Sequence, residues 1–374
     1  MTELLTGARV ITDGRVLEGM DIRVENGLIT EVAPHRAFET GKDLGGLTLA
    51  PGFIDLHVHG GGGYEFIDGT EEAFRAASCV HFAGGTRVMY PTISATDGDT
   101  MIRALETAEK VMRDLPVTVP GIHLEGPYLT PSMCGAQDTV LIRKPDPKEY
   151  LPILERFAPV IARWDYAPEQ DDGTFLKTLN DYRVLPAIAH SAAEYEHILP
   201  AYEGGCRLVT HLYSCTSTVT RHGGFRRLGV IESAFLLDGM DAEVIADGCH
   251  VPAELMRMIV KIKSPDRIAL ITDAIRCAGQ KSASGLVSGT ERVPYIIEDG
   301  VAKLSDRSAF AGSIATTEQL LKRTVQAGIP VETVVRMLTQ TPARIMGLAD
   351  FGGISAGKKA VFTAFDEKYD IVNI

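Results

Sequence analysis

The chain has 374 residues, of which 45% are hydrophobic and 23% charged, and its formal net charge at neutral pH is −12. That composition is typical of a globular protein, and the negative charge argues against contact with the phosphate backbone of a nucleic acid. The first residues lack the features of a signal peptide, and no apolar run approaches the ~20 residues of a membrane span. The six cysteines contain no Cys-x-x-Cys pair. We therefore expect a cytoplasmic protein with reduced thiols, no membrane segment and no nucleic-acid partner.

Both ends of the chain are strand-like. Near the N-terminus, Asn26-Gly27 separates two alternating runs, which is a strong hairpin signal. The expected strands are Ala8–Ile11, Asp21–Glu25 and Leu28–Val32 at the start of the chain, and Lys359–Asp366 and Tyr369–Val372 at its end. Two short β segments at opposite ends most simply pair with each other, so residues 1–50 and 350–374 are predicted to form one small composite β-domain.

The stretch Pro51–Gly60 predicts a buried strand that runs into a glycine-rich loop. Its His57 and His59 are two residues apart, so the period of two along a strand places both imidazoles on one face. Two histidines directed into one space can share a metal ion. The alternative, that one histidine packs in the core and the other caps a turn, stays open unless further ligands arrive at the ends of later strands.

Between the two end segments, strand and helix patterns alternate. Thr70 followed by two glutamates predicts a helix that ends near Gly84-Gly85, and a second helix is expected around Thr100–Met112. Counting Pro51–Gly60 as the first, the further strands expected are Thr86–Tyr90, Val119–Glu125, Val160–Tyr166, Val184–His190, Cys206–His211, Ala242–Asp247 and Arg267–Asp273. Eight strands separated by helical patterns predict an α/β protein with a (β/α)₈ TIM-like barrel over residues 51–349.

Ionisable side chains gather where these strands end, which is where chemistry concentrates in a barrel of this type. Any one of them could be a buried polar group that satisfies a neighbour. A carboxylate and two imidazoles that converge at one rim, as Glu125, His190 and His211 are expected to do, suit a borderline divalent ion. The residues at or just past strand ends are His57, His59, Glu125, His190, His211, His250 and Asp273.

Six motifs, in chain order, resemble those of a known family. The first is similar to the opening motif of the amidohydrolase superfamily, and together they resemble the N-acetylglucosamine-6-phosphate deacetylase family. The motifs are Pro51–Gly60, Gly121–Tyr128, Ala167–Glu169, Thr210–Tyr213, Ile245–Val251 and Leu270–Ala274. The resemblance extends from the first β segment to Thr341-Pro342-Ala343.

The resemblance implies a metal-dependent enzyme with one or two divalent ions per chain, Zn²⁺ or Fe²⁺, since both suit a site of imidazoles and carboxylates. The lysine with which some relatives bridge two metal ions is absent from the end of the fourth strand, where Trp164-Asp165-Tyr166 stands. The implied roles are a main metal ion at Glu125, His190 and His211, a second ion at His57 and His59, catalytic acid and base at Asp273, and substrate contact at His250.

The chain departs from the family pattern where substrate is expected to bind. Gln137 stands where the family has a histidine facing the scissile carbonyl, and Ser214-Cys215 replaces an Asn-Ala pair that lines the phosphate and sugar. The basic segment Arg221–Arg227 replaces an Arg-Glu-Pro-Gly segment that in the family reaches a neighbouring subunit. We therefore expect a homodimer with a shared anion pocket, and the further expected substrate contacts are Gln137, Ser214, Cys215, Arg221, His222 and Arg227.

The reaction implied is hydrolysis of the N-acetyl group of an amino sugar phosphate, most simply N-acetylglucosamine 6-phosphate to glucosamine 6-phosphate and acetate. Two alternatives stay open. One is an amidohydrolase acting on another N-acylated sugar or an N-acyl amino acid, and the other is a non-catalytic binding protein on an enzyme scaffold. The complete set of expected metal ligands together with Asp273 argues against the second alternative.

Overall fold

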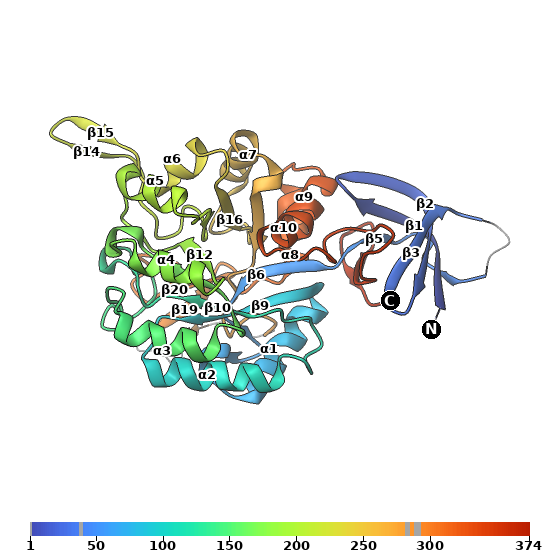
Figure 1. Cartoon of the computed structure of the whole chain (residues 1–374). Coiled ribbons are helices and arrows are strands. Elements are labelled where there is room, and N and C mark those ends of the chain that lie inside the picture. The colour runs from blue at the N-terminus through green and yellow to red at the C-terminus, as the bar shows by residue number, and fades with distance from the viewer. Residues whose placement is uncertain (1, 37–39, 281–284, 288–292) are drawn as a thin grey trace.

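The computed structural model describes residues 2–36, 40–280, 285–287 and 293–374, most of them in one barrel with a small sheet beside it (Figure 1). Eight parallel strands follow one another in sequence order around the barrel, so the predicted (β/α)₈ architecture is confirmed. The strands are β6 (Phe53–Val58), β9 (Thr86–Ser94), β10 (Ile122–Glu125), β11 (Ile161–Tyr166), β12 (Leu185–Ile188), β13 (Leu208–Val209), β16 (Asp241–Ile245) and β17 (Ile268–Ile271).

The barrel closes between its first and last strands just past their ends. Val58 and Ala274 form a parallel bridge, and the Asp273 amide donates to the His57 carbonyl at 2.9 Å. The His59 amide donates in turn to the Ala274 carbonyl at 2.8 Å. Closure therefore brings the His57-x-His59 pair beside Asp273, although 214 residues and more separate them in the sequence.

Helices cover the outside of the barrel. Thr70 Oγ1 accepts from the Ala73 amide at the start of α1, as its sequence predicts, and Asp97 caps α2 in the same way. The helices are α1 (Glu71–Ala83), α2 (Gly98–Val111), α3 (Pro147–Phe157), α4 (Thr174–Asp181), α5 (Tyr195–Glu203), α6 (Val230–Leu236), α7 (Ala253–Ile262), α8 (Thr317–Gln326), α9 (Val331–Leu338) and α10 (Gln340–Ile345). None of the helices in the described ranges is long and apolar enough to cross a membrane.

The second sheet joins the two ends of the chain. Its strand order is β22-β21-β5-β1-β2-β3, with β4 beside β1, and β21 pairs antiparallel with β5, which confirms the composite sheet predicted from the strand-like ends. The strands are β1 (Thr2–Thr12), β2 (Arg15–Glu25), β3 (Leu28–Pro34), β4 (Lys42–Asp43), β5 (Thr48–Pro51), β21 (Phe362–Phe365) and β22 (Ile371–Val372). The domain boundaries at residues 50 and 350 stay a prediction, because β5 leads directly into barrel strand β6.

Two turns organise the N-terminal strands. Asn26 and Gly27 have positive φ values of 52° and 77°, the conformation that the predicted Asn-Gly hairpin needs. Asp13 and Gly14, with φ values of 51° and 65°, make an equivalent turn between β1 and β2. Asp-Gly carries the same hairpin signal as Asn-Gly. The strands expected at Ala8–Ile11 and Asp21–Glu25 are too short, since β1 begins at Thr2 and β2 begins directly after this turn, at Arg15.

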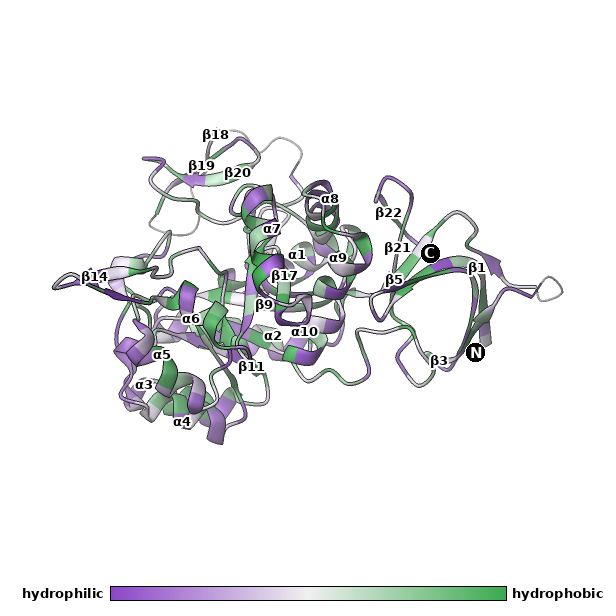
Figure 2. Cartoon of the chain, turned by 90° about the horizontal axis from the view of Figure 1, so that it is seen from above, coloured by the Kyte–Doolittle hydropathy of each residue, from purple (hydrophilic) through white to green (hydrophobic). Residues whose placement is uncertain are grey.

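Within the described ranges, three small sheets lie outside the barrel and the terminal sheet. The strands β14 (Thr220–His222) and β15 (Phe225–Arg227) form a hairpin that projects from the side of the barrel opposite the terminal sheet (Figures 1 and 2). A three-stranded sheet consists of β18 (Gly285–Val287), β19 (Tyr295–Glu298) and β20 (Val301–Leu304). A short pair, β7 (Gly60–Gly61) with β8 (Tyr64–Glu65), follows the first barrel strand.

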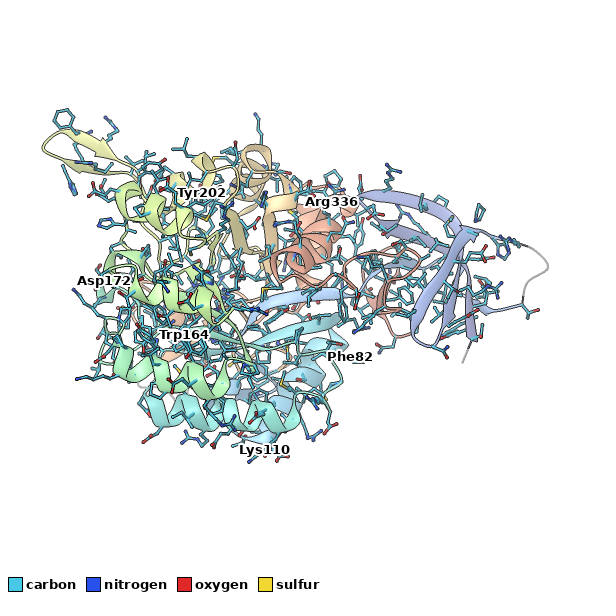
Figure 3. The ribbon with its side chains drawn as sticks, in the orientation of Figure 1. Phe82, Lys110, Trp164, Asp172, Tyr202 and Arg336 are labelled. Carbon is cyan, nitrogen blue, oxygen red and sulfur yellow. The ribbon has the colours of Figure 1, made fainter. Side chains whose placement is uncertain are left out.

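The barrel core is apolar on its outer side, between strands and helices. Figure 3 shows Trp164 of β11 among packed side chains, and its ring stacks on Tyr128 with centroids 5.7 Å apart. Phe175 of α4 meets the same indole edge-on at 5.4 Å. Burial of such aromatic side chains is a large stabilising contribution, which holds α4 against the barrel wall.

Several barrel strands are shorter than their sequence patterns predict. β13 covers Leu208–Val209 only, and β17 ends at Ile271, two residues before Asp273. The reason is that His190, His211 and Asp273 have positive φ values of 44°, 32° and 48°, so the backbone turns out of the strand at these positions. The polar residues therefore lie just beyond the strands rather than in them.

Candidate functional site

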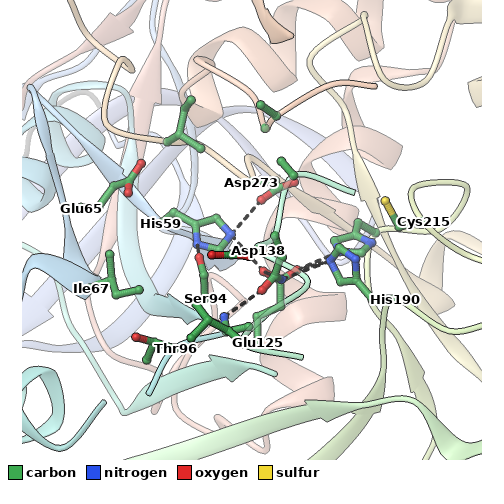
Figure 4. Close-up of a pocket in the computed structure, with 18 of the residues that line it drawn as sticks. His59, Glu65, Ile67, Ser94, Thr96, Glu125, Asp138, His190, Cys215 and Asp273 are labelled. Carbon is green, nitrogen blue, oxygen red and sulfur yellow. Dashed lines mark hydrogen bonds and ion pairs between the residues drawn. The ribbon is translucent and has the colours of Figure 1, made fainter. Parts of the chain in front are cut away.

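Six ionisable side chains meet at the carboxyl end of the barrel, and all six are buried. Figure 4 shows His59, Glu125, His190 and Asp273 among the residues that line a pocket, with Glu125 between His59 and His190. They are His57 and His59 after β6, Glu125 at the end of β10, His190 after β12, His211 after β13 and Asp273 after β17. The structure thus brings together six of the seven residues expected at strand ends, and the seventh, His250, lines the pocket.

Glu125 is the shared partner in this cluster. Its Oε1 lies 2.9 Å from His211 Nε2 and 3.1 Å from His190 Nε2. On the other side its Oε2 lies 3.4 Å from His59 Nε2, and its Oε1 lies 3.6 Å from His57 Nε2. One carboxylate therefore faces two pairs of imidazole nitrogens.

Asp273 lies on the side of the first histidine pair. Its Oδ1 is 3.2 Å from His59 Nε2 and 3.3 Å from His57 Nε2. Burial alone would raise the pKa of this carboxyl, but the charges of His57 and His59 lower it to about 2. Asp273 is accordingly ionised at neutral pH.

The same balance holds for Glu125. Burial would raise its pKa, yet His57 and hydrogen bonds with His190 and His211 hold the pKa well below its ordinary value. Conversely, burial would lower the pKa of His59, but Asp273 and Glu125 raise it well above the usual value. The carboxylates and imidazoles of this cluster therefore stabilise each other's charged forms.

Three imidazoles have a partner at Nδ1, the ring nitrogen that points away from the cluster, and these partners fix the orientation of the rings. His190 Nδ1–H donates to the Met133 carbonyl at 2.8 Å, and His211 Nδ1–H donates to the Ser214 carbonyl at 3.1 Å. Ser94 Oγ lies 3.0 Å from His59 Nδ1. With Nδ1 engaged in this way, the Nε2 atom of each ring faces the cluster, which is the orientation found in metal-binding histidines.

The donor atoms have the spacing of a metal site. Two groups, His57 with His59 and Glu125, and Glu125 with His190 and His211, each offer ligand atoms that lie within 4.8 Å of one another. In a tetrahedral site with bonds of ~2.0–2.1 Å, ligand atoms are roughly 3.3–3.4 Å apart, which is close to the separations around Glu125. The two buried groups share a carboxylate and are consistent with a binuclear metal centre.

Above the cluster lies a pocket of about 750 Å³. Its wall includes Gln137, His250 and the Ser214-Cys215 pair, so four predicted substrate contacts line it. His250 Nδ1 lies 2.7 Å from Asp247 Oδ2, which leaves its Nε2 for the pocket, and Phe310 lies against its ring with centroids 4.7 Å apart.

Gln137 has a fixed orientation at the edge of the cluster. Its Oε1 accepts from the Ala95 amide at 2.8 Å, so its amide nitrogen must face the opposite way. Nε2 then donates to Glu125 Oε2 at 2.9 Å. Gln137 therefore contacts the carboxylate that all four imidazoles share, a connection that its sequence position did not reveal.

The remaining predicted substrate contacts lie elsewhere in the chain. Arg221, His222 and Arg227 are exposed on the β14–β15 hairpin and are absent from the residues that line the pocket. There, His222 Nε2 is 3.2 Å from Glu194 and Arg227 Nη1 is 3.5 Å from Glu196. A single chain thus does not bring this basic hairpin to its own pocket.

Sequence reasoning missed a second polar layer beneath the cluster. Arg163, Asp165 and Glu243 are fully buried inside the barrel, with Arg163 Nε donating to Asp165 Oδ1 at 2.9 Å and Nη2 donating to Glu243 Oε2 at 2.9 Å. His123 joins through its Nε2, 3.0 Å from Asp165. The available signal was charge at inward positions of β11 and β16, where apolar residues are expected.

A barrel whose strand ends direct imidazoles onto a shared carboxylate, below a pocket, is the architecture of a metal-dependent hydrolase. The Amidohydrolase family matches residues 48–373. An N-acetylglucosamine-6-phosphate deacetylase from Lysinibacillus sphaericus is 29% identical over 360 residues, 94% of this chain and 90% of the relative. An N-acetylgalactosamine-6-phosphate deacetylase from Shewanella sp. (strain ANA-3) is 27% identical, covering 98% of this chain and 93% of that protein.

Solved structures agree with these relatives. The structure of a variant of N-acetyl-D-glucosamine-6-phosphate deacetylase from Mycobacterium smegmatis, in complex with N-acetyl-D-glucosamine-6-phosphate, superposes with a TM-score of 0.90 at 28% identity and covers 99% of this chain and 96% of that one. The chain therefore belongs to the amidohydrolase family and, within it, is similar over nearly its whole length to deacetylases of N-acetylhexosamine 6-phosphates. The resemblance seen in the sequence motifs is confirmed, and the chain is an enzyme of this class.

Proposed function

We propose that this enzyme removes the acetyl group from an N-acetylhexosamine 6-phosphate by metal-dependent hydrolysis, with N-acetylglucosamine 6-phosphate as its substrate. The observation that carries the proposal is the position of the ionised Asp273 beside two His/Glu groups that share Glu125 at the floor of a pocket. Relatives matched over more than nine-tenths of the chain carry the name of that activity.

The donor set fits one or two divalent ions, Zn²⁺ or Fe²⁺. Glu125, His190 and His211 would hold the main ion, and His57 and His59 the second. When bound, such an ion supplies a water molecule of lowered pKa and polarises the acetyl carbonyl. Elemental analysis tests this part: one or two ions per chain are expected, and a fully active preparation with well under one ion per chain would contradict it.

Asp273 is proposed as the group that moves the proton. Its carboxylate would take a proton from the attacking water and return it to the departing amine, a double role that needs the ionised form in the resting enzyme. The lowered pKa and the place of Asp273 at the edge of the cluster support this role.

Gln137 and His250 are proposed to hold the substrate. The amide of Gln137 carries two hydrogens on Nε2, which donates to Glu125 and also lies 3.4 Å from His190 Nε2. The hydrogen that does not go to Glu125 is proposed to meet the acetyl carbonyl oxygen when substrate is bound. His250, with its Nδ1 on Asp247, would present Nε2 to the sugar. Ser214 and Cys215 line the wall nearby, where backbone amides and side chains can contact the hexose.

The phosphate contact is proposed to come from a second subunit. Arg221, His222 and Arg227 are exposed on a hairpin that projects away from the barrel, so they are available to a neighbouring chain (Figure 1). Arginine is well suited to phosphate because its planar fork can donate two parallel hydrogen bonds. We therefore propose a homodimer with a shared anion pocket, and light scattering that shows a fully active monomer would contradict it.

A second candidate substrate is N-acetylgalactosamine 6-phosphate, since two of the similar enzymes carry that name. The deciding measurement is kcat/KM for both hexosamine phosphates, for unphosphorylated N-acetylglucosamine and for an N-acetyl amino acid. We expect the phosphate to raise kcat/KM at least about tenfold, which corresponds to roughly 1.4 kcal/mol. A smaller effect would mean that no dedicated phosphate contact exists, and preference for the amino acid would refute the sugar assignment.

A further inference from the structure

His57 differs from the other imidazoles of the cluster in the surroundings of its Nδ1. The Nδ1 atoms of His190 and His211 donate to backbone carbonyls, and that of His59 meets a hydroxyl. His57 is fully buried, and among the described residues its Nδ1 has no hydrogen-bond partner. A buried polar nitrogen without a partner calls for a physical account.

The group that faces this nitrogen is the carboxylate of Glu243. Glu243 Oε2 lies 3.6 Å from His57 Nδ1, and both side chains are completely buried. That separation is longer than a formed hydrogen bond, but a carboxylate is an acceptor only, so the proton in this gap can reside only on the histidine. On the other side of the ring, Nε2 lies 3.1 Å from His59 Nε2 and 3.3 Å from Asp273 Oδ1, so a cation held among these groups needs the lone pair on Nε2 and leaves the hydrogen on Nδ1, facing Glu243.

Arg163 holds Glu243 in that place. Its Nη1 donates to Glu243 Oε1 and its Nη2 donates to Oε2 at 2.9 Å, a two-pronged contact that fixes the plane of the carboxylate. Arg163 Nη2 also donates at 2.9 Å to Oγ1 of Thr210, the residue that precedes His211 in the sequence. Arg163, on β11, therefore reaches across the barrel interior and holds the carboxylate of Glu243, on β16.

The charges of this buried layer point the same way. Arg163 is the cationic partner of two carboxylates, because it donates to Asp165 through Nε at 2.9 Å as well as to Glu243. One positive charge against two negative charges leaves an excess of negative charge in a region where charge is costly to bury. A cation on the far side of His57 would balance it, through the polarisable imidazole that lies between.

We propose that Glu243, held by Arg163, is a positioning residue for His57: it fixes the ring with Nδ1 protonated and thereby directs the Nε2 lone pair to the second divalent cation of the cluster. The inference rests on the metal-dependent function proposed above. Carboxylate partners of this kind typically change metal affinity or activity by about 10–100-fold when they are removed.

The test is the metal content and metal affinity of Glu243→Gln. The amide of glutamine has one oxygen, which Arg163 attracts, so His57 then faces the NH₂ group. If the oxygen faces His57 instead, it is a poorer acceptor than a carboxylate. Either orientation weakens the preference for the Nδ1-protonated tautomer. We expect wild-type protein to hold two ions per chain after dialysis and the variant to hold one. Competition with a chelator should show the weaker ion bound about 10–100-fold less tightly.

Asp165→Asn is the matched control. Asp165 belongs to the same buried layer and contacts Arg163 and His123, whose ring meets that of His57 edge-on with centroids 4.6 Å apart. The carboxylate of this layer that faces His57 Nδ1 is Glu243. A purely structural role of the layer would make both variants lose metal to the same extent. We expect the control to lower Tm but to retain two ions with wild-type affinity, and equal metal loss in both variants would overturn the inference.

A second measurement needs no variant. In histidine-selectively ¹⁵N-labelled wild-type protein loaded with Zn²⁺, the His57 resonances should show a protonated Nδ1 and an unprotonated Nε2. The opposite tautomer, or a wild-type protein with a single ion per chain, would overturn the inference while leaving the proposed deacetylase function intact. Wild-type protein with no bound ion and no deacetylase activity would refute the proposed function as well.

Discussion

The floor and the wall of the pocket are built in different ways. The floor consists of buried side chains at strand ends, and the imidazoles of His190, His211 and His59 are each oriented by a partner at Nδ1. The wall consists of half-exposed residues on loops, among them Gln137, Ser214 and Cys215, where two of the departures from the family pattern fall. The contrast indicates that the reaction depends on the rigid barrel, whereas substrate choice depends on loops that can change without disturbing it.

The strongest test of this contrast is Asp273→Asn on the floor. Loss of the proposed acid and base should lower kcat by about 10²–10⁴-fold, with the fold and the bound metal unchanged. Steady-state kinetics, circular dichroism and elemental analysis of the same preparation check this prediction. Asp138→Asn, a carboxylate change on the wall, is the control and should alter kcat less than tenfold. Comparable losses in both variants would remove the distinction between floor and wall.

Gln137→Met tests the one residue that joins the two regions. The variant loses the hydrogen bond from Nε2 to Glu125, and hydrogen bonds to charged groups contribute about 1.5–3 kcal/mol, so kcat/KM should fall by about 10–100-fold. Both kcat/KM and metal affinity should be measured. A variant with wild-type values for both would mean that Gln137 belongs to the wall alone.

His250→Asn tests the wall itself. Because His250 contacts Asp247 and the pocket rather than Glu125, its loss should raise KM or lower kcat/KM by about tenfold, the effect of one hydrogen bond to substrate, without release of metal. Michaelis–Menten kinetics with N-acetylglucosamine 6-phosphate, paired with elemental analysis, provides the readout. Metal loss in this variant would place His250 with the floor.

Thr12→Val lies outside both regions and should leave catalysis unchanged. Thr12 Oγ1 accepts from the Ile354 amide at 2.9 Å, where the two chain ends meet. The near-isosteric change leaves a buried amide without its acceptor, at a cost of about 1–3 kcal/mol in the free energy of unfolding. Urea denaturation measures the loss, and a fall in kcat at full folding would show that the terminal sheet influences the pocket.

The floor could be predicted from the sequence, because its residues follow simple rules. Period two along a strand places His57 and His59 on one face, and the ends of parallel strands in a barrel lie at one rim, so His190, His211 and Asp273 were expected to meet there. Their geometry confirms that meeting, while their catalytic and metal-binding roles stay predictions. The barrel itself and the composite sheet followed from the order of strand and helix patterns.

The layer beneath the floor could not be predicted in this way. Arg163 and Glu243 lie in strands β11 and β16, 80 positions apart, and an isolated charge in a strand usually faces solvent. Only closure of the barrel shows that both point inwards and pair. The fixed amide of Gln137 likewise depends on the backbone of Ala95, 42 positions away, about which local sequence says nothing.

The sheet that joins the chain ends has a consequence for how the protein is made. The Phe53 amide donates to Thr363 Oγ1, a hydrogen bond between residues 310 positions apart. At ~5–20 residues per second, a ribosome needs roughly 15–60 s to synthesise the intervening chain. During that interval β5 has no β21 beside it, and its open edge is exposed to other nascent chains. Premature termination before Phe362 would therefore leave a barrel with the complete set of site residues joined to an incomplete sheet. We expect chaperones and proteases to act on such a product before it can contribute to catalysis.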